Sequence, residues 1–183
     1  MYTVGNKVNV EATYVPPSFA HENNKHNRAI KAIKKALLHK AIVKELPGKN
    51  SEGYDLVVYF FDNVEPYKVE IKTNNGISKT GYEYPTWLLE TFTDHYKQDL
   101  PEWRTSSVDT LIIVNMNKSQ AHIYDVETLR DYVDKHLYQE VPSGIGTKQY
   151  NQSTKLCGWG IKIPWASLEA GCLKTLDLEL EPV

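Results

Sequence analysis

Two short stretches, Glu52-Gly-Tyr-Asp55 and Val69-Glu-Ile-Lys72, decide the fold of this chain. Asp55 begins one apolar run with strand character, and Glu70 and Lys72 lie inside the next such run. Side chains two apart in a strand lie on one face, so Glu70 and Lys72 point one way and Val69 and Ile71 the other. If the two strands pair as a hairpin, Asp55 can reach Glu70. Two carboxylates and an ammonium group then meet in one small patch.

The remaining sequence predicts further strands and two longer helices. Apolar residues recur at helical spacing from Glu22 to His39 and from Val126 to Tyr138, and Asp125 can cap the second helix. Strands are predicted at 41–46, 55–61, 67–72, 110–115, 121–124 and 160–165, with a turn or short helix at 166–172. Loops are expected at 47–53, 73–85 and 142–154. Residues 86–98 fit either a strand or a helix.

This order of elements indicates an α/β (α+β) fold with a mixed central β-sheet flanked by helices. A length of 183 residues suits one domain,. We expect a single domain over 1–183, with a core at 22–141 and a C-terminal extension at 142–183. No apolar run is long enough to span a bilayer, and the polar start is no signal peptide. The expected location is the cytoplasm, or the host cytoplasm if the gene is viral, with Cys157 and Cys172 as free thiols.

The patch around Asp55 and Glu70 has the chemistry of a site for phosphodiester hydrolysis. Mg²⁺ usually sits on one or two carboxylates plus waters and phosphate oxygens. Asp55 and Glu70 supply two such carboxylates, and the carbonyl oxygen of Ile71 could add a third ligand. Lys72 could orient or deprotonate a water, or neutralise the phosphate. Glu22, on the inward stripe of the first helix, or Glu52 could complete the site.

With Asp55 on one strand and Glu70-x-Lys72 on the next, the sequence resembles the PD-(D/E)xK nuclease superfamily. Tyr54 stands where the motif has its proline, and Glu22 sits where many members carry a helix glutamate. The resemblance covers residues 22–115 and implies a restriction endonuclease-like core. The family has a helix after the lysine strand, so a strand at 86–98 would be a departure in topology.

The resemblance implies a Mg²⁺-dependent DNA endonuclease whose products carry 5′-phosphate and 3′-hydroxyl ends, with Mn²⁺ as a substitute metal. Its catalytic residues would be Asp55, Glu70, Lys72 and Glu22. A restriction enzyme, a junction resolvase and a repair or phage nuclease all remain open. A homodimer is compatible with the first two classes, because both strands must be cut.

Two other hypotheses compete with this one. Glu-x-Lys alone is a weak signal, because exposed strands often carry such ion pairs, so the pair could belong to the surface of an ordinary α/β domain. Alternatively, the protein could keep the nuclease fold without catalysis and bind nucleic acid or protein. No other motif points to catalysis, and surface or capping roles are expected for the six histidines.

Charge is unevenly distributed along the chain, although the net charge is only −2. The segment 21–50 is rich in lysine, and the tail from Ser167 is acidic. A basic face on a nearly neutral protein is compatible with DNA as partner. A solvated helix face explains the lysines equally well. The candidates for phosphate contacts are Lys25, Arg28, Lys31, Lys35 and Lys79,.

Overall fold

A computed structural model describes residues 17–46, 53–92, 100–136, 146–151 and 156–181. For 17–22, 146–151 and 156–159 only the course of the backbone is described. The elements, in chain order, are α1 (Pro17–Leu37), β1 (Ala41–Glu45), β2 (Leu56–Phe60), β3 (Tyr67–Asn74), β4 (Thr86–Phe92), α2 (Glu102–Thr105), β5 (Thr110–Asn115), β6 (Gln120–Asp125), α3 (Val126–His136), β7 (Gly146–Asn151), β8 (Leu156–Pro164) and β9 (Cys172–Asp177).

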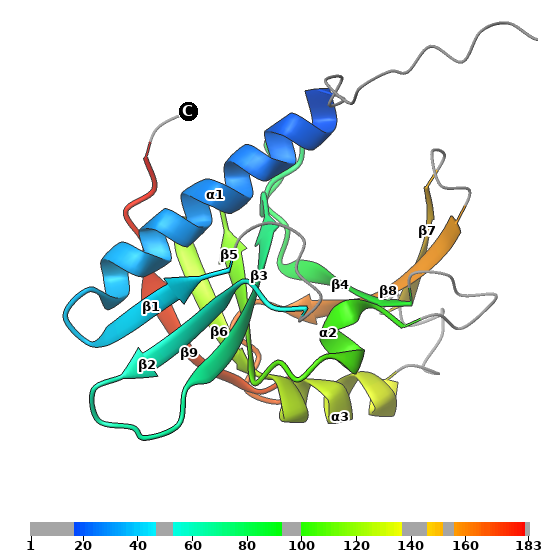
Figure 1. The fold of residues 1–183 in the computed structure, drawn as a ribbon. Helices are drawn as coiled ribbons and strands as arrows, with labels where there is room; N and C mark the ends of the chain where they lie inside the picture. The colour runs from blue at the N-terminus through cyan, green and yellow to red at the C-terminus, as the bar shows by residue number, and fades with distance from the viewer. Residues whose placement is uncertain (1–16, 47–52, 93–99, 137–145, 152–155, 182–183) are drawn as a thin grey trace, which may run out of the picture.

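The central sheet has six strands in the order β1-β2-β3-β5-β6-β9, and β3 and β5 form its parallel pair. The other neighbouring strands in this sheet are antiparallel. A second sheet has the order β4-β8-β7. Helices flank the central sheet, with α1 along one face and α3 on the opposite side (Figure 1). The predicted mixed sheet flanked by helices is therefore confirmed.

Each face of the central sheet has its own core. Ala29, Ile33 and Leu37 lie on one stripe of α1 and pack with Leu56 and Ile71, as expected for an amphipathic helix on a sheet. The opposite face packs against α2, α3 and the second sheet, through a cluster that includes Trp87, Trp103, Leu111, Leu129 and Ile161. The side chains of β3 therefore divide between two distinct environments.

Residues 86–92 form a strand, which removes the ambiguity for that part of 86–98, and residues 93–98 lie outside the described residues. Trp87, Leu89 and Thr91 are buried in alternation, and β8 pairs with this strand. A strand and then the single turn of α2 thus follow β3, where the nuclease superfamily is expected to have a helix. The topology departs from the expected core here, while β1 to β3, β5, β6 and α3 appear in the predicted order.

Other predicted boundaries need correction. The first helix begins at Pro17 rather than Glu22, because proline suits the first helical turn. The expected loop at 142–154 contains β7, and the strand β9 was not predicted. Asp125 does cap α3, since its carboxylate accepts the Thr128 N–H at 2.8 Å. Among the described residues, no helix combines the length and apolar character needed to cross a bilayer.

The loop after β3 is held by a glycine next to a buried asparagine. Gly76 has φ +70°, and a Cβ there would collide with the Asn115 amide. Gly76→Ala should therefore destabilise the fold by about 1–2 kcal/mol from backbone conformation alone. Chemical denaturation measures the loss. Gly81→Ala is the control, because Gly81 also has positive φ but has open space around its Cβ. Any further loss of stability in Gly76→Ala is then due to the collision with Asn115. Equal losses of stability in both variants would contradict that collision.

Candidate active site

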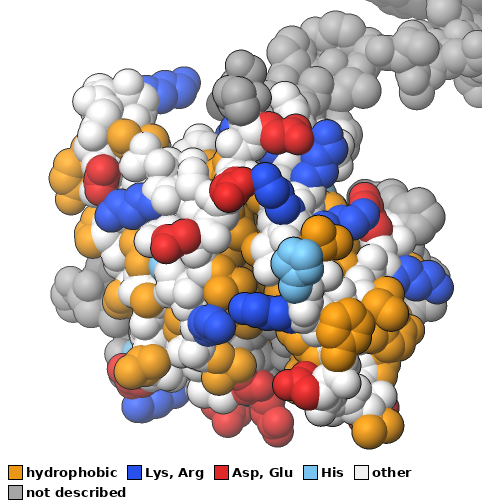
Figure 2. All heavy atoms as spheres, turned by 90° about the vertical axis from the view of Figure 1, so that its left-hand side faces the viewer, with side chains coloured by type: hydrophobic (Ala, Val, Ile, Leu, Met, Phe, Trp, Pro, Cys, Tyr) orange, Lys and Arg blue, Asp and Glu red, His pale blue; other side chains and the backbone are white. Residues whose placement is uncertain are grey.

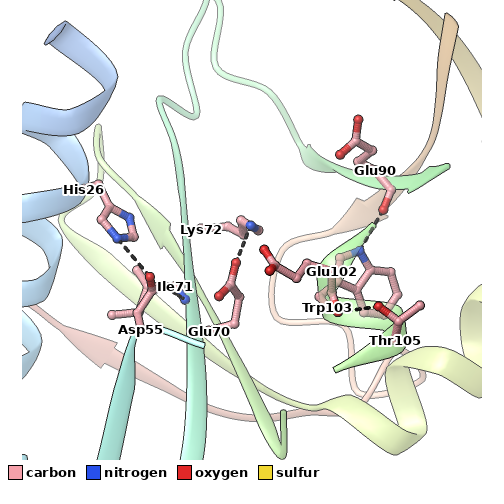
Figure 3. Close-up of polar contacts among 9 residues, drawn as sticks. All are labelled: His26, Asp55, Glu70, Ile71, Lys72, Glu90, Glu102, Trp103 and Thr105. Atoms are coloured by element: carbon pink, nitrogen blue, oxygen red, sulfur yellow. Dashed lines mark hydrogen bonds and ion pairs between the residues drawn. The ribbon is translucent and has the colours of Figure 1, made fainter. Parts of the chain in front are cut away.

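Asp55 lies just before β2, with its carboxylate fixed against the edge of β3. Its Oδ2 accepts the Ile71 N–H at 2.7 Å, and its own N–H donates to the Val69 carbonyl at 2.9 Å. These two bonds continue the hairpin ladder beyond the last paired residue of β2. The N–H and carbonyl of one strand residue point the same way, so the Ile71 carbonyl lies on this edge too. Figure 3 shows Asp55 between α1 and β3.

Glu70 and Lys72 share the other face of β3, as predicted, while Val69 and Ile71 pack under α1. Glu70 is only 6% exposed, and the Lys72 Nζ forms an ion pair with its Oε1. Half of the Lys72 side chain is exposed, at 50%. The lysine therefore connects a buried carboxylate with solvent.

The electrostatics of Glu70 reflect a buried charge that one lysine only partly compensates. Burial raises the pKa of Glu70, and the neighbouring charges of Asp55 and Glu102 raise it further, against the opposing effect of Lys72. Glu70 thus senses the charge of Asp55, as expected from the hairpin. An additional cation at this point would relieve their repulsion.

His26, on α1, contacts the site directly. Its Nε2 lies 3.3 Å from Oδ1 of Asp55, and this bond raises the pKa of His26. The expected surface or capping role is therefore wrong for this histidine. A sequence signal did exist, because His26 lies on the inward stripe that connects Ala29 to Glu22.

The short helix α2 adds a carboxylate and a wall to the site. Glu102 points toward Glu70 in Figure 3, and Trp103 is buried beside it. The Trp103 Nε1–H donates to the Glu90 carbonyl at 2.8 Å, which ties α2 to β4. A cavity of about 390 Å³ opens here, lined among others by Lys72, Asn74, Trp87, Leu88, Glu90 and Glu102. No sequence pattern pointed to Glu102, because a single helical turn is too short to show periodicity.

The predicted DNA-contacting residues fall into two groups. The first, which we call the α1 ridge, comprises Arg28, Lys31 and Lys35. It meets the acidic tail: Arg28 donates to the Glu181 carbonyl, Lys31 lies 3.6 Å from the Glu181 carboxylate, and Lys35 pairs with Glu179. Figure 2 shows basic and acidic side chains interspersed on this side of the molecule.

The second group, Lys25 and Lys79, lines a cavity of about 380 Å³ at the end of β3, next to Thr73 and Asn74. This cavity adjoins the strand that carries Lys72. DNA contact by either group stays a prediction.

Two predicted auxiliary acids lie beyond what the structure describes. Glu22 belongs to α1, but its side chain is not described, and Glu52 lies outside the described residues. Within the described part of the chain, no three or more His, Cys, Asp or Glu side chains are grouped as a metal site. The potential ligands that can be placed are therefore Asp55, Glu70 and the Ile71 carbonyl, with His26 beside them.

Comparison with known proteins yields little beyond this geometry. No family model matches the chain, and neither does any curated protein. Among solved structures, a bacterial homing endonuclease matches with a TM-score of 0.39 and 16% sequence identity, over 61% of this chain and 71% of that one. A likeness at this level carries no conclusion about function. The resemblance to PD-(D/E)xK nucleases rests on Asp55, Glu70 and Lys72 and stays a prediction.

Proposed function

We propose that this protein is a Mg²⁺-dependent DNA endonuclease that hydrolyses phosphodiester bonds at the Asp55–Glu70–Lys72 site. The observation that carries the proposal is the buried carboxylate of Glu70, whose raised pKa shows an incompletely compensated charge between Asp55 and Lys72. Carboxylates whose pKa is shifted beside a cavity are typical of functional sites. An ordinary surface ion pair does not fit, because the Glu70 side chain is only 8% exposed.

The donor set fits a hard divalent cation. Asp55 and Glu70 would hold the ion, with the Ile71 carbonyl on the same strand edge as a further oxygen ligand. Mg²⁺ needs one or two protein carboxylates and keeps several waters, so the absence of a larger cluster among the described side chains is compatible with it. Bound there, Mg²⁺ would supply charge stabilisation at the phosphoryl oxygens and a coordinated water of lowered pKa.

Lys72 would act on the phosphate and the attacking water. Its ammonium is held on the Glu70 carboxylate and reaches toward the 390 Å³ cavity that it helps to line. From there Nζ can donate a hydrogen bond to a phosphoryl oxygen or orient a water for attack on phosphorus. The Ile71 N–H holds Oδ2 of Asp55, and Oδ1 faces α1, where it contacts the His26 Nε2 at 3.3 Å.

The proposal is tested by incubating the protein with supercoiled, linear and branched DNA, with and without Mg²⁺. Cleavage that depends on Mg²⁺, or on Mn²⁺ in its place, and that leaves 5′-phosphate ends is expected. The preferred substrate separates a restriction-type activity from a branch-specific one. If none of the three DNAs is cut with either metal, the enzymatic assignment is wrong.

One observation favours the alternative, a nuclease-fold protein that binds nucleic acid or protein without catalysis. The Glu70 carboxylate is already paired with Lys72, and no third acidic ligand is grouped with it among the described side chains. Such a module would bind DNA with an affinity that Mg²⁺ does not change, and would leave it intact. The incubation above distinguishes the two functions directly.

The α1 ridge gives a prediction about DNA affinity. Its lysines pair with Glu179 and Glu181 at the surface, and exposed pairs of this kind contribute little to stability because water and salt screen them. DNA phosphates can therefore displace the tail. The double substitution Glu179→Gln/Glu181→Gln should strengthen DNA binding about two- to fivefold at low salt and steepen its salt dependence, as measured by fluorescence anisotropy.

A control must remove the same charge elsewhere. Asp62→Asn/Glu65→Gln does so at the exposed turn between β2 and β3 and should change affinity little. If the tail variant binds DNA like this control, the α1 ridge makes no phosphate contacts. DNA would then contact the Lys25 and Lys79 side alone.

A further inference from the structure

A second cavity adjoins the candidate active site at the end of β3. It has a volume of about 380 Å³. Thr73 and Asn74 line both this cavity and the one that Lys72 helps to line. Successive residues of a strand advance by about 3.3 Å, so the shared wall begins one residue beyond Lys72. A strand of nucleic acid bound at Lys72 can therefore continue into the second cavity.

The groups that line the second cavity suit a phosphate. Lys25 of α1 and Lys79 of the loop after β3 supply two ammonium groups, and Asn75 and Ser78 supply an amide and a hydroxyl. None of its described lining residues is acidic. Lysine, asparagine and serine side chains are common donors to the phosphate oxygens of DNA, and two cations in one hollow attract an anion.

The loop that carries Lys79 has a defined conformation. The Ser78 N–H donates to the Tyr82 carbonyl at 2.8 Å, and the Gly81 N–H donates to the Ser78 carbonyl at 3.1 Å. The Ser78 Oγ also accepts the Tyr82 N–H at 2.9 Å. Lys79 thus lies in the turn of a small hairpin. Because the backbone is already ordered, an anion can bind there at little cost in conformational entropy.

Lys25 is positioned by the same part of α1 that contacts the candidate active site. It precedes His26, whose Nε2 hydrogen-bonds with Oδ1 of Asp55 at 3.3 Å. The helix is fixed on the sheet through Ala29 and Ile33, and the loop after β3 lies beside its first turns (Figure 1). A phosphate held by Lys25 would therefore have a fixed place relative to Asp55.

We propose that the second cavity binds a backbone phosphate of the DNA strand that is cut, one or two nucleotides from the scissile phosphate. This inference rests on the proposed endonuclease function and specifies where the substrate strand lies. Phosphates follow one another about every 3.4 Å along each strand of a duplex, and the two residues from Lys72 to Asn74 span about 6–7 Å of β3. Lys25 and Lys79 are then positioning residues, which hold the strand in register without touching the reacting atoms.

DNA binding without metal, measured by fluorescence anisotropy, tests the two lysines. Lys79→Ala should weaken binding about five- to tenfold at 0.1 M salt and reduce the salt slope by about one. Lys25→Gln should act alike, with circular dichroism as the check on its folding. Lys68→Ala is the control, because Lys68 lines a cavity of similar size, about 410 Å³, together with Glu65 and Asp109. It should change neither quantity.

Cleavage of duplexes that carry one neutral methylphosphonate tests the register. In wild type, the substitution one or two nucleotides from the cut, on one side only, should raise KM about five- to tenfold. The same duplex should cause no further loss in Lys79→Ala, because the charge on the protein side is already gone. A substitution on the other side of the cut should affect both proteins equally.

The outcomes separate the inference from the proposed function. If Lys79→Ala binds DNA like Lys68→Ala, the second cavity holds no phosphate. Cleavage by wild type with every methylphosphonate acting equally in wild type and Lys79→Ala would overturn the register and leave the endonuclease standing. DNA that is bound through Lys79 but never cut would refute the endonuclease function and, with it, the place of this phosphate beside a scissile one.

Discussion

Asp55→Asn should reduce the rate of DNA cleavage at least about 100-fold, because it removes one of the two charges that would hold the proposed metal ion. The substitution is nearly isosteric, and an asparagine Oδ1 can still accept the Ile71 N–H that Asp55 accepts at 2.7 Å. The fold should therefore be unchanged. Single-turnover cleavage of supercoiled plasmid in Mg²⁺ measures the loss, with circular dichroism as the check on folding.

Lys72→Ala should lose cleavage to a similar extent for a different reason. It leaves both carboxylates in place, so Mn²⁺ binding should persist while the group that contacts water or phosphate is gone. Lys68→Ala is a matched control, since Lys68 precedes Glu70 by two residues on the same face of β3 and contacts Ser107 instead. If Lys72→Ala cuts DNA as fast as Lys68→Ala, Lys72 has no role in catalysis.

Glu70→Gln should abolish cleavage and at the same time stabilise the protein. Burial raises the pKa of Glu70, so the folded state binds a proton at this group more tightly than the unfolded state does. The ionised form therefore opposes folding at neutral pH, and a neutral glutamine removes that cost. Each kcal/mol gained raises the melting temperature by about 2–4 °C for a chain of this size.

The pH dependence gives the sign of this effect. Below the ordinary pKa of a glutamate, about 4.3, Glu70 is protonated in both states, and the variant should gain nothing. The extra stability of Glu70→Gln over wild type should grow as the pH rises from the ordinary pKa of a glutamate to the raised pKa of Glu70. Above that pH it should stay constant. Thermal melts of both proteins across this range in the absence of metal measure it. A variant less stable than wild type at neutral pH would contradict the buried-charge account.

The core of the site was predictable because its pattern is local. Glu70 and Lys72 share a face through the two-residue period of a strand, and Asp55 is placed by the hairpin that follows from two adjacent apolar runs. The interpretation of residues 86–92 needed more than local pattern. Their alternation of Trp87, Leu89 and Thr91 suits a strand, but the pairing with β8 that stabilises it comes from a distant part of the chain.

The features that the sequence did not reveal depend on contacts between distant segments. His26 belongs to a visible stripe, yet its role depends on how α1 crosses the start of β2, which no periodicity specifies. Glu102 lies in a one-turn helix. β9 is a mostly exposed strand without apolar alternation, and the pairing of the α1 ridge with Glu179 and Glu181 joins residues almost a whole chain apart.

Calorimetric titration with Mn²⁺ tests most directly the central claim that Asp55 and Glu70 form a metal site beside Lys72. Wild type and Lys72→Ala should both show saturable binding heat, and Asp55→Asn and Glu70→Gln should show little or none. Saturable heat that persists in both carboxylate variants would place the metal elsewhere. No heat in wild type would contradict the account as a whole.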